Sequence, residues 1–178
     1  MASRVTYHHE MPTANGSRTP LGPPQLEIAV IDDSDIVGWL AALTRLNELY
    51  MTDVRSMVAA VKQRCASIVG STIRRLDILD HGNVNGVEIG SDWITMKTVG
   101  RFDGLFRQLA PLFAPKGFVH LQQCNAGQNH ALLGHFSSLF RVPVYAGTGG
   151  QNPVYRFNLG KYERCIPNGD CESDVARP

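Results

Sequence analysis

The chain has 178 residues, a length that fits one domain of ordinary size. Hydrophobic residues make up 43% and charged residues 19%, which excludes a globally disordered chain and a coiled coil. The 17 Lys and Arg nearly balance the 16 Asp and Glu, so nucleic acid is not expected to be the main partner.

The first 24 residues differ in composition from the rest. They contain four prolines and no periodic apolar face, so we expect residues 1–24 to form a flexible tail and residues 25–178 a single domain. No apolar run reaches the roughly 18 to 20 residues of a membrane helix, and no signal-peptide core is present. Four cysteines are too few for a disulfide-built scaffold. We therefore expect a cytoplasmic protein without a membrane partner, or one exported without a cleaved signal.

Strand and helix patterns alternate along the chain. In order, the patterns predict a strand at 26–31, helices at 37–50 and 54–69, a strand at 76–79, a hairpin at 87–94, a helix at 99–113, a strand at 118–121, a helix at 132–140, a strand at 142–146 and a terminal hairpin over 154–162 with Gly160 in its turn. This order predicts an α/β fold of three layers, α/β/α, with a mostly parallel sheet and flanking helices.

Four of the predicted strands end in polar or glycine-rich residues. The pairs are Asp32-Asp33, His81-Gly82, Cys124-Asn125 and Gly147-Thr148. Ligand sites of open α/β sheets gather beyond the carboxyl ends of the strands, so these pairs are expected at one edge of the sheet.

His81 and Cys124 are the pair that could carry chemistry. Alone, a cysteine is more often a small core residue and a strand-end histidine a surface residue. On adjacent strands, the imidazole of His81 could take the thiol proton of Cys124, whose thiolate would be the nucleophile. The backbone N–H groups of Gly82 and Cys124 could then stabilise an oxyanion.

These residues resemble the caspase-like fold of clan CD cysteine peptidases, which includes caspases, metacaspases, clostripain, gingipains and separase. In that fold a His-Gly pair ends one strand and the catalytic Cys ends the next parallel strand, as residues 79–82 (Leu-Asp-His-Gly) and 120–127 (His-Leu-Gln-Gln-Cys-Asn-Ala-Gly) do here. His81 precedes Cys124 by 43 residues, close to the caspase spacing of roughly 50. The resemblance covers about residues 25–150 and also extends to small bacterial caspase-like domains.

The chain departs from the family pattern at several positions. Glycine stands three residues after Cys124, at Gly127, where caspases have it two after. Metacaspases place an Asp two before the Cys, whereas this chain has Gln122, as caspases do. No Asp-rich processing linker is found.

The resemblance places a substrate pocket at the strand ends. It would be formed by Asp32, Asp33, Gln122, Gly147 and Thr148. The two carboxylates favour Arg or Lys at the P1 position, next to the cleaved bond.

The sequence therefore predicts a cysteine endopeptidase that hydrolyses protein or peptide substrates through a His81/Cys124 dyad and a thioester, without a cofactor or metal. An inactive caspase-like interaction or scaffold domain is the alternative, because fold alone does not establish activity. An unrelated α/β binding domain is a third reading.

Other candidates have ordinary interpretations. The acidic residues after the first strand (Asp32, Asp33, Asp35) could bind a metal or a basic group, but Asp is also common in solvated turns. Gly147 to Gly150 lacks the nucleotide-binding spacing and fits one wall of a peptide cleft, and Trp93 could line that cleft.

The remaining cysteines and histidines leave alternatives open. Cys165 and Cys171 could form a disulfide or half a metal site, although two free or reversibly bridged thiols are favoured. His130 and His135 are not at helical metal-pair spacing and are expected on the surface.

Overall fold

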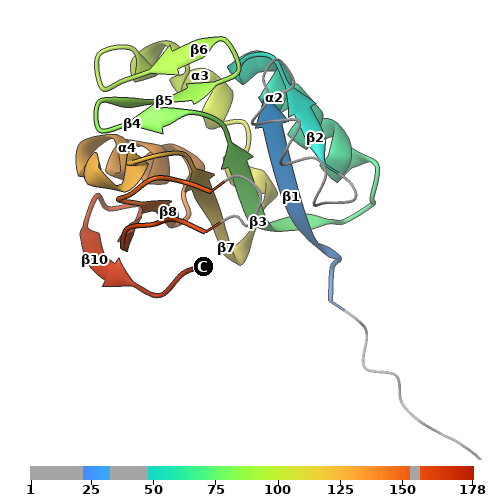
Figure 1. Ribbon diagram of the computed structural model, residues 1–178. Coiled ribbons are helices and arrows are strands. Elements are labelled where there is room, and N and C mark those ends of the chain that lie inside the picture. Colours follow the sequence, from blue (N-terminus) through green and yellow to red (C-terminus); the bar gives the residue numbers. More distant parts are fainter. Residues whose placement is uncertain (1–21, 33–47, 153–156) are drawn as a thin grey trace, which may run out of the picture.

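The computed structural model describes residues 22–32, 48–152 and 157–178. Within them, seven strands form one sheet in the order β10-β9-β8-β7-β3-β1-β2, and β4, β5 and β6 form a second, small sheet (Figure 1). The large sheet comprises β1 (Gln25–Asp32), β2 (Leu49–Met51), β3 (Thr72–Leu79), β7 (Phe113–Gln122), β8 (Val144–Gly147), β9 (Tyr162–Cys165) and β10 (Cys171–Val175). The predicted α/β class is confirmed.

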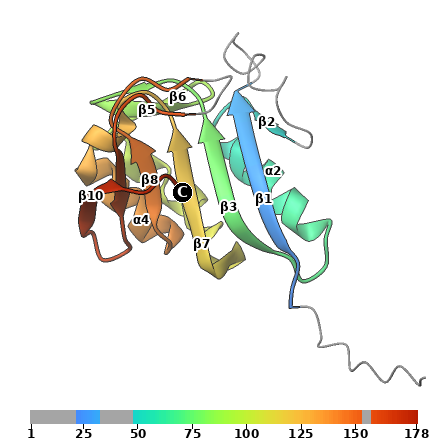
Figure 2. The same ribbon diagram turned by 60° about the horizontal axis from the view of Figure 1, so that its bottom comes forward.

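The five strands from β2 to β8 run parallel, and β9 and β10 are antiparallel additions at one edge. From β1 the chain moves to β2 on one side, then returns to β3 on the other side of β1. The strand order therefore reverses between β1 and β3, and open α/β sheets bind ligands beyond the carboxyl ends at such a point. Figure 2 shows the carboxyl ends of β1, β3 and β7 at one edge of the sheet.

One face of the sheet is apolar and covered by helices. Helices α2 (Val54–Ala66), α3 (Asp103–Phe106) and α4 (His130–Phe140) share one buried cluster with alternate residues of the strands, and α2 and α4 lie behind the sheet in Figure 2. The other face carries a small buried apolar cluster, Ala29, Ile31 and Leu79, and also buried polar residues. Asp77 of β3 lies beside His120 of β7 in register, with Asp77 Oδ1 3.3 Å from His120 Nδ1 and 2.8 Å from Arg75 Nε.

The sheet and its helices are compatible with the predicted three-layer α/β/α arrangement. The predicted helix at 37–50 lies largely outside the described residues, as do Asp33, Asp35 and the predicted tail up to residue 21. Its last two residues, Leu49 and Tyr50, belong to β2, so the helix prediction is wrong there. They pair with Val30 and Ile31 of β1, and this tertiary pairing overrides the local helical spacing.

Helix α2 begins at a capping box. The Asp53 carboxylate accepts the N–H of Ser56 at 2.6 Å, and Ser56 Oγ accepts the N–H of Asp53 at 3.0 Å. The apolar spacing that predicted this helix places Val54, Met57 and Val61 in the core.

The small sheet follows β3 directly. It contains β4 (Gly82–Asn83), β5 (Gly86–Ile89) and β6 (Asp92–Ile94), paired antiparallel, so the hairpin predicted over 87–94 is present. Its β5–β6 turn is hydrogen-bonded to the start of α2. The N–H of Ser91 donates to Thr52 O at 2.8 Å, and Asp92 Oδ2 accepts the N–H of Val54 at 3.0 Å.

The helix predicted over 99–113 is wrong as one element. The segment forms short pieces, η1 (Val99–Arg101), α3 and η2 (Ala110–Leu112), and Phe113 already begins β7. Gly100 and Gly104 weaken a continuous helix, and Pro111 lacks the N–H that the helix interior needs. The apolar residues still reach the core, because Phe106 and Leu109 are fully buried.

The hairpin predicted over 154–162 lies partly outside the described residues, and the terminal hairpin that the structure describes comes later in the chain. It joins β9 to β10 through a turn at Gly169, whereas Gly160 lies in the continuation of β8 and β9. Cys165 and Cys171 face each other across this hairpin and form a disulfide, so they are bridged thiols in this structure and not the free thiols that were the other favoured possibility.

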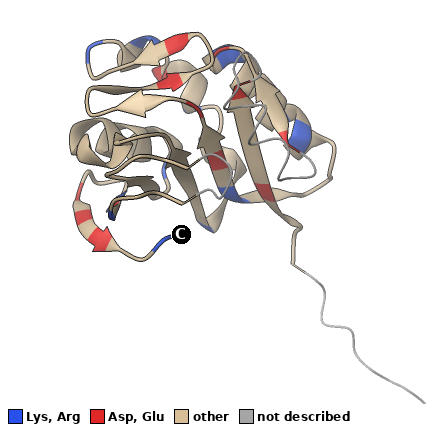
Figure 3. Cartoon of the chain, viewed as in Figure 1, with Lys and Arg blue, Asp and Glu red and all other residues tan. Residues whose placement is uncertain are grey.

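Charged residues of both signs are interspersed along the described chain (Figure 3). None of its helices is long and apolar enough to span a bilayer.

Candidate active site

His81 and Cys124 follow adjacent parallel strands at matching positions. Leu79, the last residue of β3, is paired in register with Gln122, the last residue of β7. His81 and Cys124 each stand two positions beyond this pair. The following glycine confirms the proximity of the two segments. A Cβ on Gly82 would lie 2.8 Å from Gln123 Cβ and 3.2 Å from the carbonyl oxygen of Cys124. Only glycine allows the backbone after His81 to approach Cys124 this closely.

A buried carboxylate holds the backbone of His81. Asp80 Oδ1 accepts the N–H of His81 at 2.7 Å, and Oδ2 accepts the N–H of Gly90 in the β5–β6 turn at 2.8 Å. The carbonyl of His81 accepts the N–H of Glu88 at 2.9 Å. His81 itself is exposed, so its backbone is fixed while the residue remains accessible to a substrate.

Burial raises the pKa of the Asp80 carboxyl group. Loss of water around Asp80 raises its pKa to about 7, and the charges of Asp32 and Glu88 add to the effect; the two N–H donors act in the opposite direction. A group next to the candidate base therefore changes charge near neutral pH.

Cys124 is a free, half-buried cysteine at a sharp turn. Asn125 adopts the left-handed conformation (φ 58°), which Asn tolerates better than most residues, and the chain then enters η3 (Ala126–Gln128). The sulfur accepts the backbone N–H of Gln151 at 3.2 Å. The nucleophile candidate is thus held from the β8–β9 side as well as from β7.

The predicted pocket residues are not all brought together. Asp32 continues the Ile28 and Val30 series, which faces the helices, and its charge acts on Asp80. Gln122 lies on the opposite face with His120, since its Nε2 is 3.4 Å from His120 Nδ1. Asp32 and Gln122 therefore do not form one pocket floor.

Gly147 and Thr148 lie beside the Cys124 turn. A Cβ on Gly127 would lie 2.8 Å from the carbonyl oxygen of Ala146 and 2.9 Å from the carbonyl carbon of Gly147. The carbonyl of Thr148 accepts the side-chain amide of Gln128 at 2.7 Å. These two positions therefore border the segment that carries Cys124.

Three residues with clear roles were not predicted. They are Asp80, Gln151 and Asn158, which anchor the backbone around His81 and Cys124. Asp80 carried a local signal, an acidic residue at the end of an apolar strand. The other two act through long-range contacts for which the sequence offers only the glycines at 147, 149 and 160.

The two histidines of α4 each lie beside a carboxylate. His130 Nε2 lies 2.9 Å from Glu163 Oε2, and His135 Nε2 lies 2.9 Å from Asp103 Oδ1. Within the described ranges, no three His, Cys, Asp or Glu side chains gather as a metal site would require.

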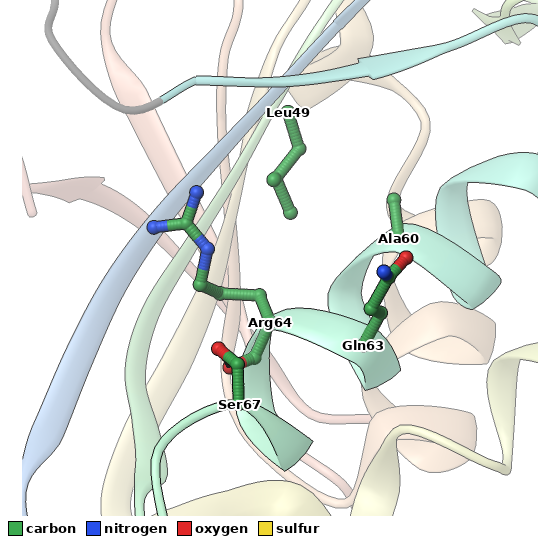
Figure 4. Close-up of a pocket in the computed structure, with 5 residues that line it drawn as sticks. All are labelled: Leu49, Ala60, Gln63, Arg64 and Ser67. Carbon is green, nitrogen blue, oxygen red and sulfur yellow. Dashed lines mark hydrogen bonds between the residues drawn. The ribbon is translucent and has the colours of Figure 1, made fainter.

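A cavity of about 300 Å³ lies elsewhere, between β2 and the end of α2. Figure 4 shows Leu49 opposite the residues at the end of α2 that line the cavity: Ala60, Gln63 and Arg64 of the helix and Ser67 at its C-cap. This lining includes no histidine, cysteine or carboxylate, so the cavity adds nothing to the His81/Cys124 chemistry.

No family model matches this chain, and no curated protein sequence matches it either.

Proposed function

We propose that the chain is a cysteine endopeptidase with a caspase-like fold, in which His81 and Cys124 form the catalytic dyad. One observation carries this proposal: the two residues stand at matching positions beyond adjacent parallel strands, with Gly82 packed against Gln123 and Cys124. The reversal of strand order next to β3 supports a ligand site at the same edge.

The proposed reaction begins with transfer of the Cys124 thiol proton to the imidazole of His81. The thiolate attacks the peptide carbonyl carbon, and the N–H groups of Gly82 and Cys124 stabilise the oxyanion. The intermediate collapses to a thioester as His81 gives its proton to the leaving amine. Water, deprotonated by His81, then hydrolyses the thioester and restores the thiol.

The sulfur environment suits this chemistry. The N–H of Gln151 donates to Cys124 Sγ, and a hydrogen bond to an ionised acceptor is stronger than one to a neutral acceptor. The thiolate formed in the proposed reaction would therefore keep this contact.

The proposal includes no P1 preference. Arg or Lys was favoured because Asp32 and Asp33 were expected beside Gln122. Asp32 instead faces the helices with Asp80, and Asp33 lies outside the described residues.

Cleavage of a peptide library tests the proposal. We expect the native chain to cleave a subset of peptides and Cys124→Ala to cleave none. His81→Ala should lower kcat by about 100- to 10,000-fold, the range for a general base. Cys65→Ala and His135→Ala are matched controls outside the site and should retain activity.

Two results would contradict the assignment. Cleavage that survives in Cys124→Ala would exclude Cys124 as the nucleophile. A native chain that cleaves nothing, with Cys124 no more reactive than an ordinary thiol toward a peptide electrophile, would favour the inactive scaffold domain.

A further inference from the structure

The glycine-rich run at 147–150 is built around one side chain, that of Asn158. A Cβ on Gly147 would lie 2.0 Å from Asn158 Cγ, so no other residue fits there without displacing the amide. Gly149 and Gly160 approach each other equally closely: a Cβ on Gly149 would lie 2.3 Å from the nitrogen of Gly160. These glycines let two backbone segments, 148–151 and 157–160, pack around Asn158. We call the two segments the arm.

The Asn158 side chain is buried and uses both halves of its amide. Its Oδ1 accepts the N–H groups of Gly149 and Gly160, each at 2.8 Å, and its Nδ2 donates to Gly149 O at 2.9 Å. Its backbone N–H donates to the Tyr162 hydroxyl at 3.2 Å. Only 8% of Asn158 is exposed, so losing these partners would leave backbone groups of the arm without bonds.

The arm reaches the nucleophile at two points. The carbonyl of Gly149 accepts the N–H of Asn125 at 2.8 Å, so one oxygen is shared by Asn158 and by the residue after Cys124. Two residues further along the arm, the N–H of Gln151 donates to Cys124 Sγ. Two contacts fix the backbone between Gly149 and Gln151. Gln151 pairs with Asn158, and the N–H of Leu159 donates to Gly150 O at 2.9 Å.

We propose that Asn158 is a positioning residue for the nucleophile: it fixes the arm so that the Gln151 N–H points at the Cys124 sulfur and Gly149 holds the turn behind it. The inference rests on the proposed function in taking that sulfur as the nucleophile. Asn suits this position because the site needs a donor and acceptors at once, and the neutral amide adds no negative charge near a thiolate.

The rate of Cys124 alkylation by iodoacetamide tests this role without requiring peptidase activity. Mass spectrometry of the labelled peptides separates Cys124 from the buried Cys65. Asn158→Ala should slow Cys124 alkylation at neutral pH by about ten-fold, the change expected from losing one hydrogen bond to a charged atom. Gly147→Ala should give a similar loss, because its Cβ displaces the Asn158 amide.

Two controls separate positioning from general destabilisation. Ser137→Ala removes a buried hydrogen bond to Val142 O (2.7 Å) away from the arm, so it should lower stability and leave alkylation unchanged. Gly104→Ala adds a methyl group where no atom lies within 4 Å and should change neither property. Circular dichroism and thermal melts identify any variant that fails to fold.

The outcomes distinguish the two proposals. If Asn158→Ala and Gly147→Ala are folded and alkylate at the native rate, or if Ser137→Ala slows alkylation equally, the positioning role is wrong and the peptidase proposal is unaffected. If both arm variants slow alkylation but the native chain cleaves no peptide, the positioning role holds and the peptidase proposal fails. If one variant does not fold, the other decides.

Discussion

The two halves of the candidate dyad are held by different chemistry. His81 is anchored by an ionisable acceptor: the Asp80 carboxyl group accepts the N–H groups of His81 and Gly90. Cys124 is anchored by a neutral amide, because Asn158 fixes the arm that donates the Gln151 N–H to the sulfur. Both anchors are buried, and both depend on glycines that allow backbones to meet closely.

The contacts made by Asp80 and by Asn158 should respond differently to pH. A carboxylate that is buried near other acids changes protonation near neutral pH, whereas an amide does not titrate. The His81 side of the site should therefore respond to pH, and the arm side should not. The following predictions test that contrast, from the largest expected effect to the smallest.

The strongest perturbation of the His81 anchor is Gly90→Ala. Gly90 has φ +57°, and a Cβ there would lie 2.2 Å from the carbonyl carbon of Thr52. Backbone strain and the clash together should lower the free energy of unfolding by about 3 kcal/mol. Chemical denaturation measures the change, and the lost turn should also lower any peptidase activity.

Gly70→Ala is the matched control. Gly70 also has a positive φ (+72°), but nothing lies within 4 Å of the position its Cβ would take. Only the backbone cost of about 1 kcal/mol should remain. Equal losses in the two variants would show that the contact with Thr52 does not anchor the β5–β6 turn.

The contrast between the two anchors also shows what the sequence could predict. Apolar runs such as 76–79 and 118–121 determine β3 and β7 locally, and when these two strands pair, Leu79 lies beside Gln122. His81 and Cys124 could therefore be assigned to neighbouring strand ends. Asp80 is adjacent to His81, so its contact with the His81 backbone could have been predicted from the sequence.

The arm could not be predicted in the same way. Asn158 acts on Cys124 through Gly149 and Gln151, and these contacts exist only after β8 and β9 have paired. The faces of Asp32 and Gln122 were equally hidden, since they depend on strand alternation across three paired strands rather than on distance along the chain.

The pH dependence of stability tests the charged anchor. Since folding raises the Asp80 pKa from 3.8 to about 7, the folded chain retains a proton that the unfolded chain releases. The associated stability is complete below about pH 4 and is lost as pH rises toward 7, by up to about 1.4 kcal/mol per pH unit. Asp80→Asn cannot titrate and lacks this loss.

We therefore expect the free energy of unfolding of the native chain to fall by about 2 kcal/mol relative to Asp80→Asn between pH 5 and pH 7. Urea unfolding at four or five pH values measures it. Parallel curves for the two proteins would mean that Asp80 is ionised throughout, and that its two N–H donors outweigh its burial. Asn158→Ala serves as the comparison and should give a difference from the native chain that does not vary with pH.

The smallest effect concerns the amide of Gln151. Because Cys124 Sγ accepts this N–H, Cys124→Ala should speed its hydrogen exchange by about five-fold, as expected from the loss of about 1 kcal/mol of hydrogen bonding. The next amide is an internal control: the N–H of Asn152, the residue after the first arm segment, donates to Phe157 O at 2.9 Å and should exchange at the native rate. Nuclear magnetic resonance resolves both amides in one experiment. If both accelerate together, the sulfur holds the arm in place rather than the reverse, and the rigidity assigned to Asn158 is contradicted. If only Gln151 responds, the arm keeps its shape without the sulfur, as an anchor built from Asn158 and its glycines requires.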